Sequence, residues 1–226
     1  TRWSDIQRLI EMRSATPHDI LGMHPASLAG RRRGVIVRAY HPSAVRVMCL
    51  PEGRAPHSMQ PLAPGLFGAF IADLAVGARY RLRFEYFDGN VEERHDPYRF
   101  LPTLGEWDLH LFNEGTHRRL WEVLGARPRK HEGVAGTSFS VWAPNATGVA
   151  VVGDFCAWDG RVFPMRALGS SGIYELFLPD VGDGALYKFE IRTEGGMLRL
   201  KTGPMAASLG CPPQTASRVF ASSYSF

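Results

Sequence analysis

Apolar and polar residues alternate over several short stretches of the chain, and Gly, Pro, Asn or Asp bounds each stretch. Successive side chains of a β-strand point to opposite faces, so such alternation predicts strands with one face in a core and one in solvent. Tight-turn residues such as Asp88-Gly89-Asn90 lie where hairpins belong. The clearest stretch sets core-facing Tyr187, Phe189 and Ile191 against outward-facing Lys188, Glu190 and Arg192.

The two halves of the chain repeat this pattern. Tyr40-His41-Pro42-Ser43-Ala44 aligns with Trp142-Ala143-Pro144-Asn145-Ala146, and each segment lies between two alternating runs. Further along, Tyr80 aligns with Tyr187 inside another pair of similar runs. Each half offers about five short strands, a number typical of small sandwich domains. We therefore predict an all-β chain with two tandem immunoglobulin-like β-sandwiches, at residues 1–100 and 135–226.

Helical signals are few and short. Trp3, Ile6, Leu9 and Ile10 recur at helical spacing and predict a short helix at the start of the first domain. Residues 106–112 and 118–124 predict two more between the sandwiches. We expect residues 101–134 to form a partly helical connector that packs between the domains, because the stretch is too apolar for a free linker. Its apolar side chains include Trp107, Leu109, Leu111, Leu120, Trp121 and Leu124.

Composition and charge narrow the possible partners. The chain has 226 residues, which suits two domains of ~100 residues each, and no apolar run approaches the ~20 residues of a membrane span. The net charge of +4 comes from residues 1–100, where Arg31-Arg32-Arg33 is the sharpest basic run. Three arginines in a glycine-flanked loop favour a solvated loop over a nucleic-acid site. We therefore expect no nucleic acid and no membrane as partners.

The first residues and the cysteines of the sequence predict how the chain was processed and in which compartment it is found. The sequence begins without Met and without an apolar signal segment, which indicates a trimmed or processed front. Cys49, Cys156 and Cys211 are odd in number and widely spaced, without the spacing of a zinc site. Three free thiols are typical of a reducing compartment, so we predict a cytoplasmic protein. We expect no metal ion and no cofactor.

Binding chemistry is better represented than catalytic chemistry. The sequence contains no nucleophile elbow and no phosphate-binding glycine loop, and no pair of carboxylates stands out, so we assign no catalytic residue. Trp158 lies at a strand-to-loop turn before Asp159-Gly160, where an indole can stack on the apolar face of a sugar. Lys188 could donate to a sugar hydroxyl. The residues leave equally open that Trp158 covers the core and Lys188 is only solvated.

Several strings carry a resemblance that spans nearly the whole chain in consecutive order. They are Asp19-Ile20-Leu21-Gly22-Met23-His24-Pro25, His95-Asp96-Pro97-Tyr98-Arg99-Phe100, Glu114-Gly115-Thr116-His117, Trp142-Ala143-Pro144-Asn145-Ala146 and Pro213-Gln214-Thr215-Ala216-Ser217. Together they resemble the amino-terminal part of bacterial glycogen branching enzymes, the 1,4-α-glucan branching enzymes of the α-amylase superfamily (glycoside hydrolase family 13). The second half resembles a family 48 carbohydrate-binding module.

The resemblance implies a function that lies partly outside this chain. Family members transfer α-1,4-glucan segments to 6-hydroxyls and so create the α-1,6 branches of glycogen, using acidic residues of a (β/α)8 barrel. That barrel is expected soon after Phe226, so this chain by itself should be inactive. Its implied partners are α-1,4-glucan or glycogen and the enzyme's own catalytic barrel. Trp158 matches the module's sugar-stacking tryptophan, and Lys188 matches the lysine of its Tyr-Lys-Phe string.

The sequence also departs from the family pattern. An Asn is lost within Phe155-Cys156-Ala157-Trp158, Thr202-Gly203-Pro204-Met205 replaces the usual Ser-Asp-Pro-Tyr, and no aromatic residue lies near Met197. Two other readings remain open. The chain could be a stand-alone glucan-binding or scaffold protein, or the front of another amylase-superfamily enzyme such as a debranching enzyme or a trehalose-forming hydrolase.

Overall fold

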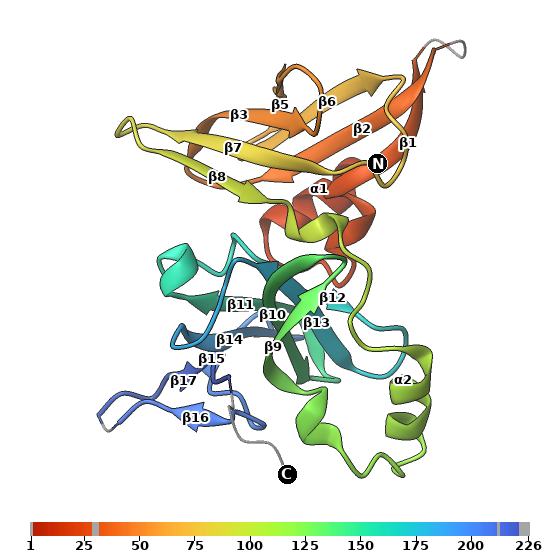
Figure 1. The fold of residues 1–226 in the computed structure, drawn as a ribbon. Helices are drawn as coiled ribbons and strands as arrows, with labels where there is room; N and C mark the ends of the chain where they lie inside the picture. Colours follow the sequence, from red (N-terminus) through yellow and green to blue (C-terminus); the bar gives the residue numbers. More distant parts are fainter. Residues whose placement is uncertain (1, 29–31, 212, 222–226) are drawn as a thin grey trace. The chain divides into compact units, whose positions relative to one another are not determined.

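The structure, a computed structural model, describes residues 2–28, 32–211 and 213–221 (Figure 1). Arg31 of the basic run lies outside the described residues. The chain divides into two compact units: unit 1 comprises Thr1–Ile10 and Pro17–Arg99, and unit 2 comprises Glu11–Thr16 and Phe100–Phe226. Strands dominate both units, which confirms the all-β class. No helix within the described ranges has the length and apolarity needed to cross a membrane.

Unit 1 is a sandwich of two four-stranded antiparallel sheets, in the orders β1-β2-β6-β5 and β4-β3-β7-β8. Side chains from both sheets form one core, in which Val35 and Ile71 of the first sheet join Val47 and Phe84 of the second. The helical elements are α1 (Trp3–Ile10), η1 (Pro17–Asp19) and η2 (Pro97–Arg99). The strands are β1 (Gly22–Leu28), β2 (Arg32–Tyr40), β3 (Ala44–Pro51), β4 (His57–Ser58), β5 (Gln60–Ala63), β6 (Leu66–Ala72), β7 (Tyr80–Tyr86) and β8 (Val91–His95).

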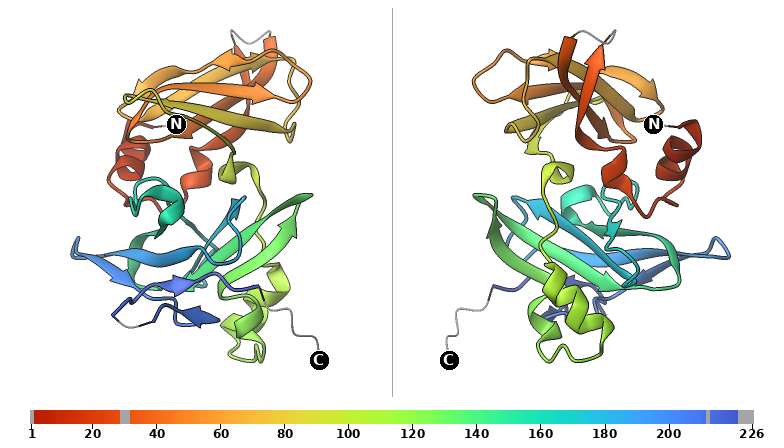
Figure 2. Two further views of the ribbon diagram at one scale, coloured as in Figure 1. Left: turned by 60° about the vertical axis from the view of Figure 1, so that its left-hand side comes forward. Right: turned by 90° about the vertical axis from the view of Figure 1, so that its right-hand side faces the viewer.

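Unit 2 also stacks two sheets, seen from two further sides in Figure 2. One has the order β12-β13-β10-β9; the other has the order β11-β14-β17-β16, with β15 also paired to β14. The rings of Phe139 in β10 and Tyr187 in β14 meet at 5.1 Å between the sheets. The strands are β9 (Gly125–His131), β10 (Val134–Trp142), β11 (Ala146–Gly153), β12 (Arg166–Ala167), β13 (Ile173–Pro179), β14 (Leu186–Thr193), β15 (Leu198–Lys201), β16 (Ser208–Leu209) and β17 (Ser217–Arg218).

The sequence repeat reappears in the topology. The first sheet of unit 1 follows the order β1-β2-β6-β5, and unit 2 follows the equivalent order β9-β10-β13-β12. The register of β3 with β7 shifts between Ala44 and Arg46, and that of β11 with β14 shifts at the aligned position, between Ala146 and Gly148. Tyr80 and Tyr187, aligned in the sequence, are both buried. The two sandwiches therefore share strand order as well as residue pattern.

The connector folds onto unit 2. Its helices are α2 (Glu106–Asn113) and the single turn η3 (Leu120–Glu122). Leu109 and Leu120 pack against Leu124 and Ile173 on the sheet that contains β13. The aromatic residues of this stretch do not follow the prediction, because Trp107 and Trp121 are exposed rather than packed. Residues 125–131, expected within the connector, form the edge strand β9.

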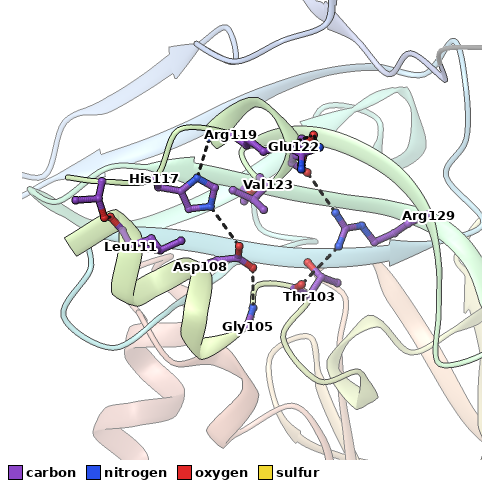
Figure 3. A network of polar contacts seen from close by, with 11 residues as sticks. Thr103, Gly105, Asp108, Leu111, His117, Arg119, Glu122, Val123 and Arg129 are labelled. Atoms are coloured by element: carbon purple, nitrogen blue, oxygen red, sulfur yellow. Dashed lines mark hydrogen bonds and ion pairs between the residues drawn. The ribbon is translucent and has the colours of Figure 1, made fainter. Parts of the chain in front are cut away.

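Polar contacts fix the connector's shape (Figure 3). His117 Nδ1 accepts the Arg119 backbone N–H at 3.2 Å, so Nε2 carries the hydrogen that faces Asp108 Oδ1 at 3.2 Å. The other Asp108 oxygen accepts the Gly105 N–H at the start of α2. The histidine of the Glu-Gly-Thr-His string thus ties α2 to the segment that follows it, and its role in this fold is structural.

A buried carboxyl organises the end of unit 1. Asp96 is 1% exposed; its Oδ2 accepts the Tyr80 hydroxyl at 2.5 Å and its Oδ1 accepts the Tyr98 N–H at 3.0 Å. Burial raises the pKa of Asp96 to about 6, although these hydrogen bonds and the charges of Arg94 and Arg99 lower it. The folded state therefore binds the Asp96 proton more tightly than the unfolded chain, whose Asp side chains titrate near ~3.9.

Replacing Asp96 with Asn should change how the stability of the protein depends on pH. Because the folded-state pKa is raised, ionisation of Asp96 destabilises the fold progressively from about pH 4 to pH 6, by up to about 3 kcal/mol. The free energy of urea unfolding of the wild type, minus that of Asp96→Asn, is expected to decrease from pH 4 to pH 7. Asp88→Asn, in an exposed hairpin turn, is the matched control. A difference that stays constant over this range would contradict the prediction.

Candidate glucan-binding site

The candidate site begins where β11 ends. A Cβ atom on Gly153 would lie 2.2 Å from the carbonyl oxygen of Leu186 and 2.6 Å from the ring of Phe155, so only glycine allows this approach to β14. The turn η4 (Asp154–Cys156) follows directly. The Gly153 N–H donates to Cys156 Sγ at 3.4 Å, and burial raises the pKa of that thiol. The chain therefore leaves the sheet in a tight loop close to β14.

Two consecutive residues of this loop adopt the left-handed conformation. Ala157 has φ +49° and Trp158 has φ +61°. This region disfavours residues with a side chain by roughly 1–2 kcal/mol each. Hydrogen bonds offset the strain: the Trp158 N–H donates to the Gly153 carbonyl at 3.0 Å, and the Asp159 N–H donates to the Cys156 carbonyl at 3.0 Å. Strained backbone of this kind concentrates at functional sites.

The loop presents Trp158 at the surface. The residue is 39% exposed, which separates it from core residues such as Tyr187 and Phe189 at 0%. Its indole Nε1–H donates to Asp154 Oδ1 at 3.2 Å. The other Asp154 oxygen accepts the Leu186 N–H of β14 at 3.4 Å. The indole is thus a partly exposed apolar surface whose polar edge is already hydrogen-bonded.

Lys188 lies on the outer face of β14. Tyr187 and Phe189, its neighbours, are fully buried, while Lys188 and Glu190 are partly exposed, so the predicted alternation holds here. Ile191, expected in the core, is only half-buried. The Lys188 ammonium donates to Thr215 Oγ1 at 2.7 Å. Thr215 therefore fixes the direction of the lysine, a role that no sequence pattern indicated.

The tryptophan loop (residues 154–160) contacts β14 at two points. At one end, Asp154 binds the backbone of Leu186. At the other, a Cβ on Gly160 would lie 2.4 Å from Glu190 Oε1, so the loop touches the Glu190 carboxylate. Burial raises the pKa of Glu190, and nearby Asp159 raises it further. In the sequence of β14, Lys188 lies between these two contact points.

After Lys201 the sequence departs from the family pattern, but this segment still forms hydrogen bonds with the segment around β17. Thr202 Oγ1 donates to the Thr215 carbonyl at 2.8 Å, and the Gly203 N–H donates to Ser217 Oγ at 2.9 Å. The segment that replaces Ser-Asp-Pro-Tyr thus holds the strand that supports Lys188. Within the described ranges, no group of three or more His, Cys, Asp or Glu residues is arranged to hold a metal ion.

Comparison with known proteins assigns each unit. Residues 2–98 match the family described as "alpha-1,4-glucan branching enzyme GlgB, N-terminal domain". Residues 123–206 match "Carbohydrate-binding module 48 (Isoamylase N-terminal domain)". The chain is similar to the amino-terminal region of GlgB branching enzymes. The resemblance inferred from the sequence strings is thereby confirmed.

Relatives from three bacteria match over almost the whole chain. The chain is 49% identical over 221 residues to "1,4-alpha-glucan branching enzyme GlgB 2" of Streptomyces coelicolor, covering 98% of this chain and 29% of that protein. For the GlgB of Myxococcus xanthus the identity is 48% over 217 residues, covering 96% and 29%. For that of Rhodococcus jostii it is 46% over 227 residues, covering 98% and 30%. The chain therefore spans about three-tenths of the length of these GlgB relatives.

Replacing Trp158 with Ala should lower the stability of the chain only moderately. The ring is partly exposed, so we expect a loss of about 1–2 kcal/mol, below the ~3–5 kcal/mol typical of a core aromatic residue. Urea or thermal unfolding measures the change. Phe139→Ala, which empties a fully buried site between the sheets, provides the contrast. Equal losses for the two variants would show that Trp158 is a core residue.

Proposed function

We propose that unit 2 binds α-1,4-glucan chains and that Trp158 and Lys188 carry the binding. The observation on which this rests is the partly exposed Trp158 indole, whose loop contacts β14 at Leu186 and Glu190, to either side of Lys188 in the sequence, within residues that match carbohydrate-binding module 48. The C–H face of a glucose ring can stack on the indole. Lys188 has three N–H donors and uses one on Thr215, so the others are available to sugar hydroxyls.

We expect the proposed glucan binding to be weak and to depend on the face of the Trp158 indole. A glucose ring is well hydrated, and one platform desolvates few contacts, so we expect an affinity of about millimolar. Because Asp154 already accepts the indole N–H, Trp158 contributes to sugar binding mainly by stacking. Longer glucans present several rings to the platform and should bind better than maltose for that reason.

We further propose that the chain works as the amino-terminal part of a glycogen branching enzyme. The support is the set of relatives named as 1,4-alpha-glucan branching enzymes, of which it spans about three-tenths. In this proposal the whole protein transfers α-1,4-glucan segments to 6-hydroxyls and so forms α-1,6 branches in glycogen. Its catalytic barrel is the intramolecular partner of this chain. The glucan site would raise the local concentration of glycogen near that barrel.

The domain division and the location belong to the same proposal. In this proposal residues 1–100 contain the first domain and residues 135–226 most of the second, and the connecting residues 101–134, including β9, fold as part of the second. We propose a cytoplasmic location, because Cys49, Cys156 and Cys211 are all free thiols. Cys211 is exposed, and an exposed free thiol persists best in a reducing compartment.

Replacing Trp158 with Ala should weaken glucan binding by about 2 kcal/mol, or roughly thirtyfold, as expected for an anchor residue. Lys188→Met should weaken it less, because a hydrogen bond made at the surface contributes about 1 kcal/mol. Affinity electrophoresis in glycogen gels and titration with maltoheptaose measure both effects. Trp107→Ala, an exposed tryptophan of α2, is the control. Wild-type retardation of the Trp158→Ala variant would refute the proposed site.

The chain by itself should not branch glucan. The proposed catalytic residues lie in the barrel, outside these 226 residues. Incubation with amylose should leave both the absorbance of the iodine complex and the number of reducing ends at the level of a heat-inactivated control. A full-length GlgB relative run in parallel shows that the assay detects branching. Branching by the 226-residue chain above the control would contradict the assignment.

A further inference from the structure

Trp158 sits on backbone that does not favour it. Two successive left-handed residues, Ala157 and Trp158, carry the ring away from β11. Such backbone persists only where surrounding contacts determine it. The backbone hydrogen bonds of the loop fix the Cα position of Trp158, but they leave the side-chain torsions of the indole free. A further contact is therefore needed to hold the ring in one orientation.

Asp154 provides that contact. Its Oδ1 accepts the Nε1–H of the Trp158 indole at 3.2 Å, and Trp158 follows Asp154 by four residues in the sequence. Its Oδ2 accepts the Leu186 N–H at 3.4 Å, and Leu186 precedes Lys188 by two residues on β14. One carboxylate thus connects the indole to the strand that carries the lysine. The ring and Lys188 are thus both attached to β14, the ring through Asp154.

We propose that Asp154 is a positioning residue for glucan binding, which holds the Trp158 indole in register with Lys188 before the sugar arrives. This inference rests on the proposed function of Trp158 and deepens it. Because Asp154 occupies the polar edge of the indole, the ring offers sugar its face. A ring that is already ordered loses less conformational freedom on binding, and affinity rises for that reason.

The test compares three variants of the 226-residue chain with maltoheptaose as the probe. Asp154→Ala removes both hydrogen bonds and should weaken binding about tenfold. Asp154→Asn keeps a carbonyl oxygen that can accept the indole N–H, and it should retain most of the affinity. Asp159→Asn makes the same charge change in the same loop, but Asp159 pairs with Arg161 rather than with the indole. That variant should bind like the wild type.

Two readouts separate positioning from a direct sugar contact. The indole N–H resonance of Trp158, assigned by its loss in Trp158→Ala, should shift in Asp154→Ala even without sugar. In the Trp158→Ala background, adding Asp154→Ala should cause no further loss of affinity, since a positioning residue acts only through the ring. Thermal melts of each variant establish that it is folded.

The outcomes distinguish this inference from the proposed function. An unshifted indole resonance in Asp154→Ala, or a further loss of affinity in the double variant, overturns the positioning role while leaving Trp158 as the anchor. If instead the wild type and Trp158→Ala bind maltoheptaose equally, the proposed function fails. The indole shift in Asp154→Ala would then show that Asp154 only supports the fold.

Discussion

The antiparallel pairing of β11 with β14 determines which face of the sheet carries Lys188 and where the tryptophan loop leaves β11. Val152 is in register with Lys188, and Gly153 is in register with Tyr187. A slip of one residue would turn Lys188 into the core and Tyr187 into solvent. Tyr187 and Phe189, both fully buried, oppose such a slip because exposing either ring would cost several kcal/mol. The same register brings Gly153 against the backbone of Leu186. The tryptophan loop begins directly after Gly153.

A buried ion pair explains why unit 2 begins well before its matched module. Glu175 on β13 is completely buried, and a lone carboxylate there would be strongly unfavourable. Arg166 contacts its Oε2 at 2.9 Å, and the Thr103 hydroxyl donates to its Oε1 at 2.9 Å. Arg166 also donates to the Phe100 carbonyl at 3.1 Å. Residues 100–103 are thus required to satisfy Glu175, and they belong to the same folded unit as β13.

Alternation and repetition predict the sheets but not the details of the site. The buried Tyr187 and Phe189 follow from the alternating pattern, and the shared strand order follows from the repeat. The exposure of Trp107 and Trp121 does not follow, because apolar composition cannot show which side of a short helix meets a sheet. The alternating pattern also does not decide whether Trp158 is exposed, because its exposure depends on two left-handed residues that have side chains rather than the usual glycine. The contact of Asp154 with Leu186 and that of Thr215 with Lys188 join residues distant in the chain, which spacing does not reveal.

The candidate site is assembled from three separate segments of unit 2. The loop after β11 contributes Trp158 and Asp154, β14 contributes Lys188, and the segment before β17 contributes Thr215. The match to carbohydrate-binding module 48 ends at residue 206, before Thr215. The lysine therefore depends on a residue outside the matched module, and Thr202 holds that residue's backbone through a further hydrogen bond. Because β17 also pairs with β14 at Leu186 and Tyr187, the strand that supports Asp154 and the strand that follows Thr215 are one continuous sheet. β11 and β17 thus pair with β14 on opposite edges, and β14 connects the supports of the indole and of the lysine.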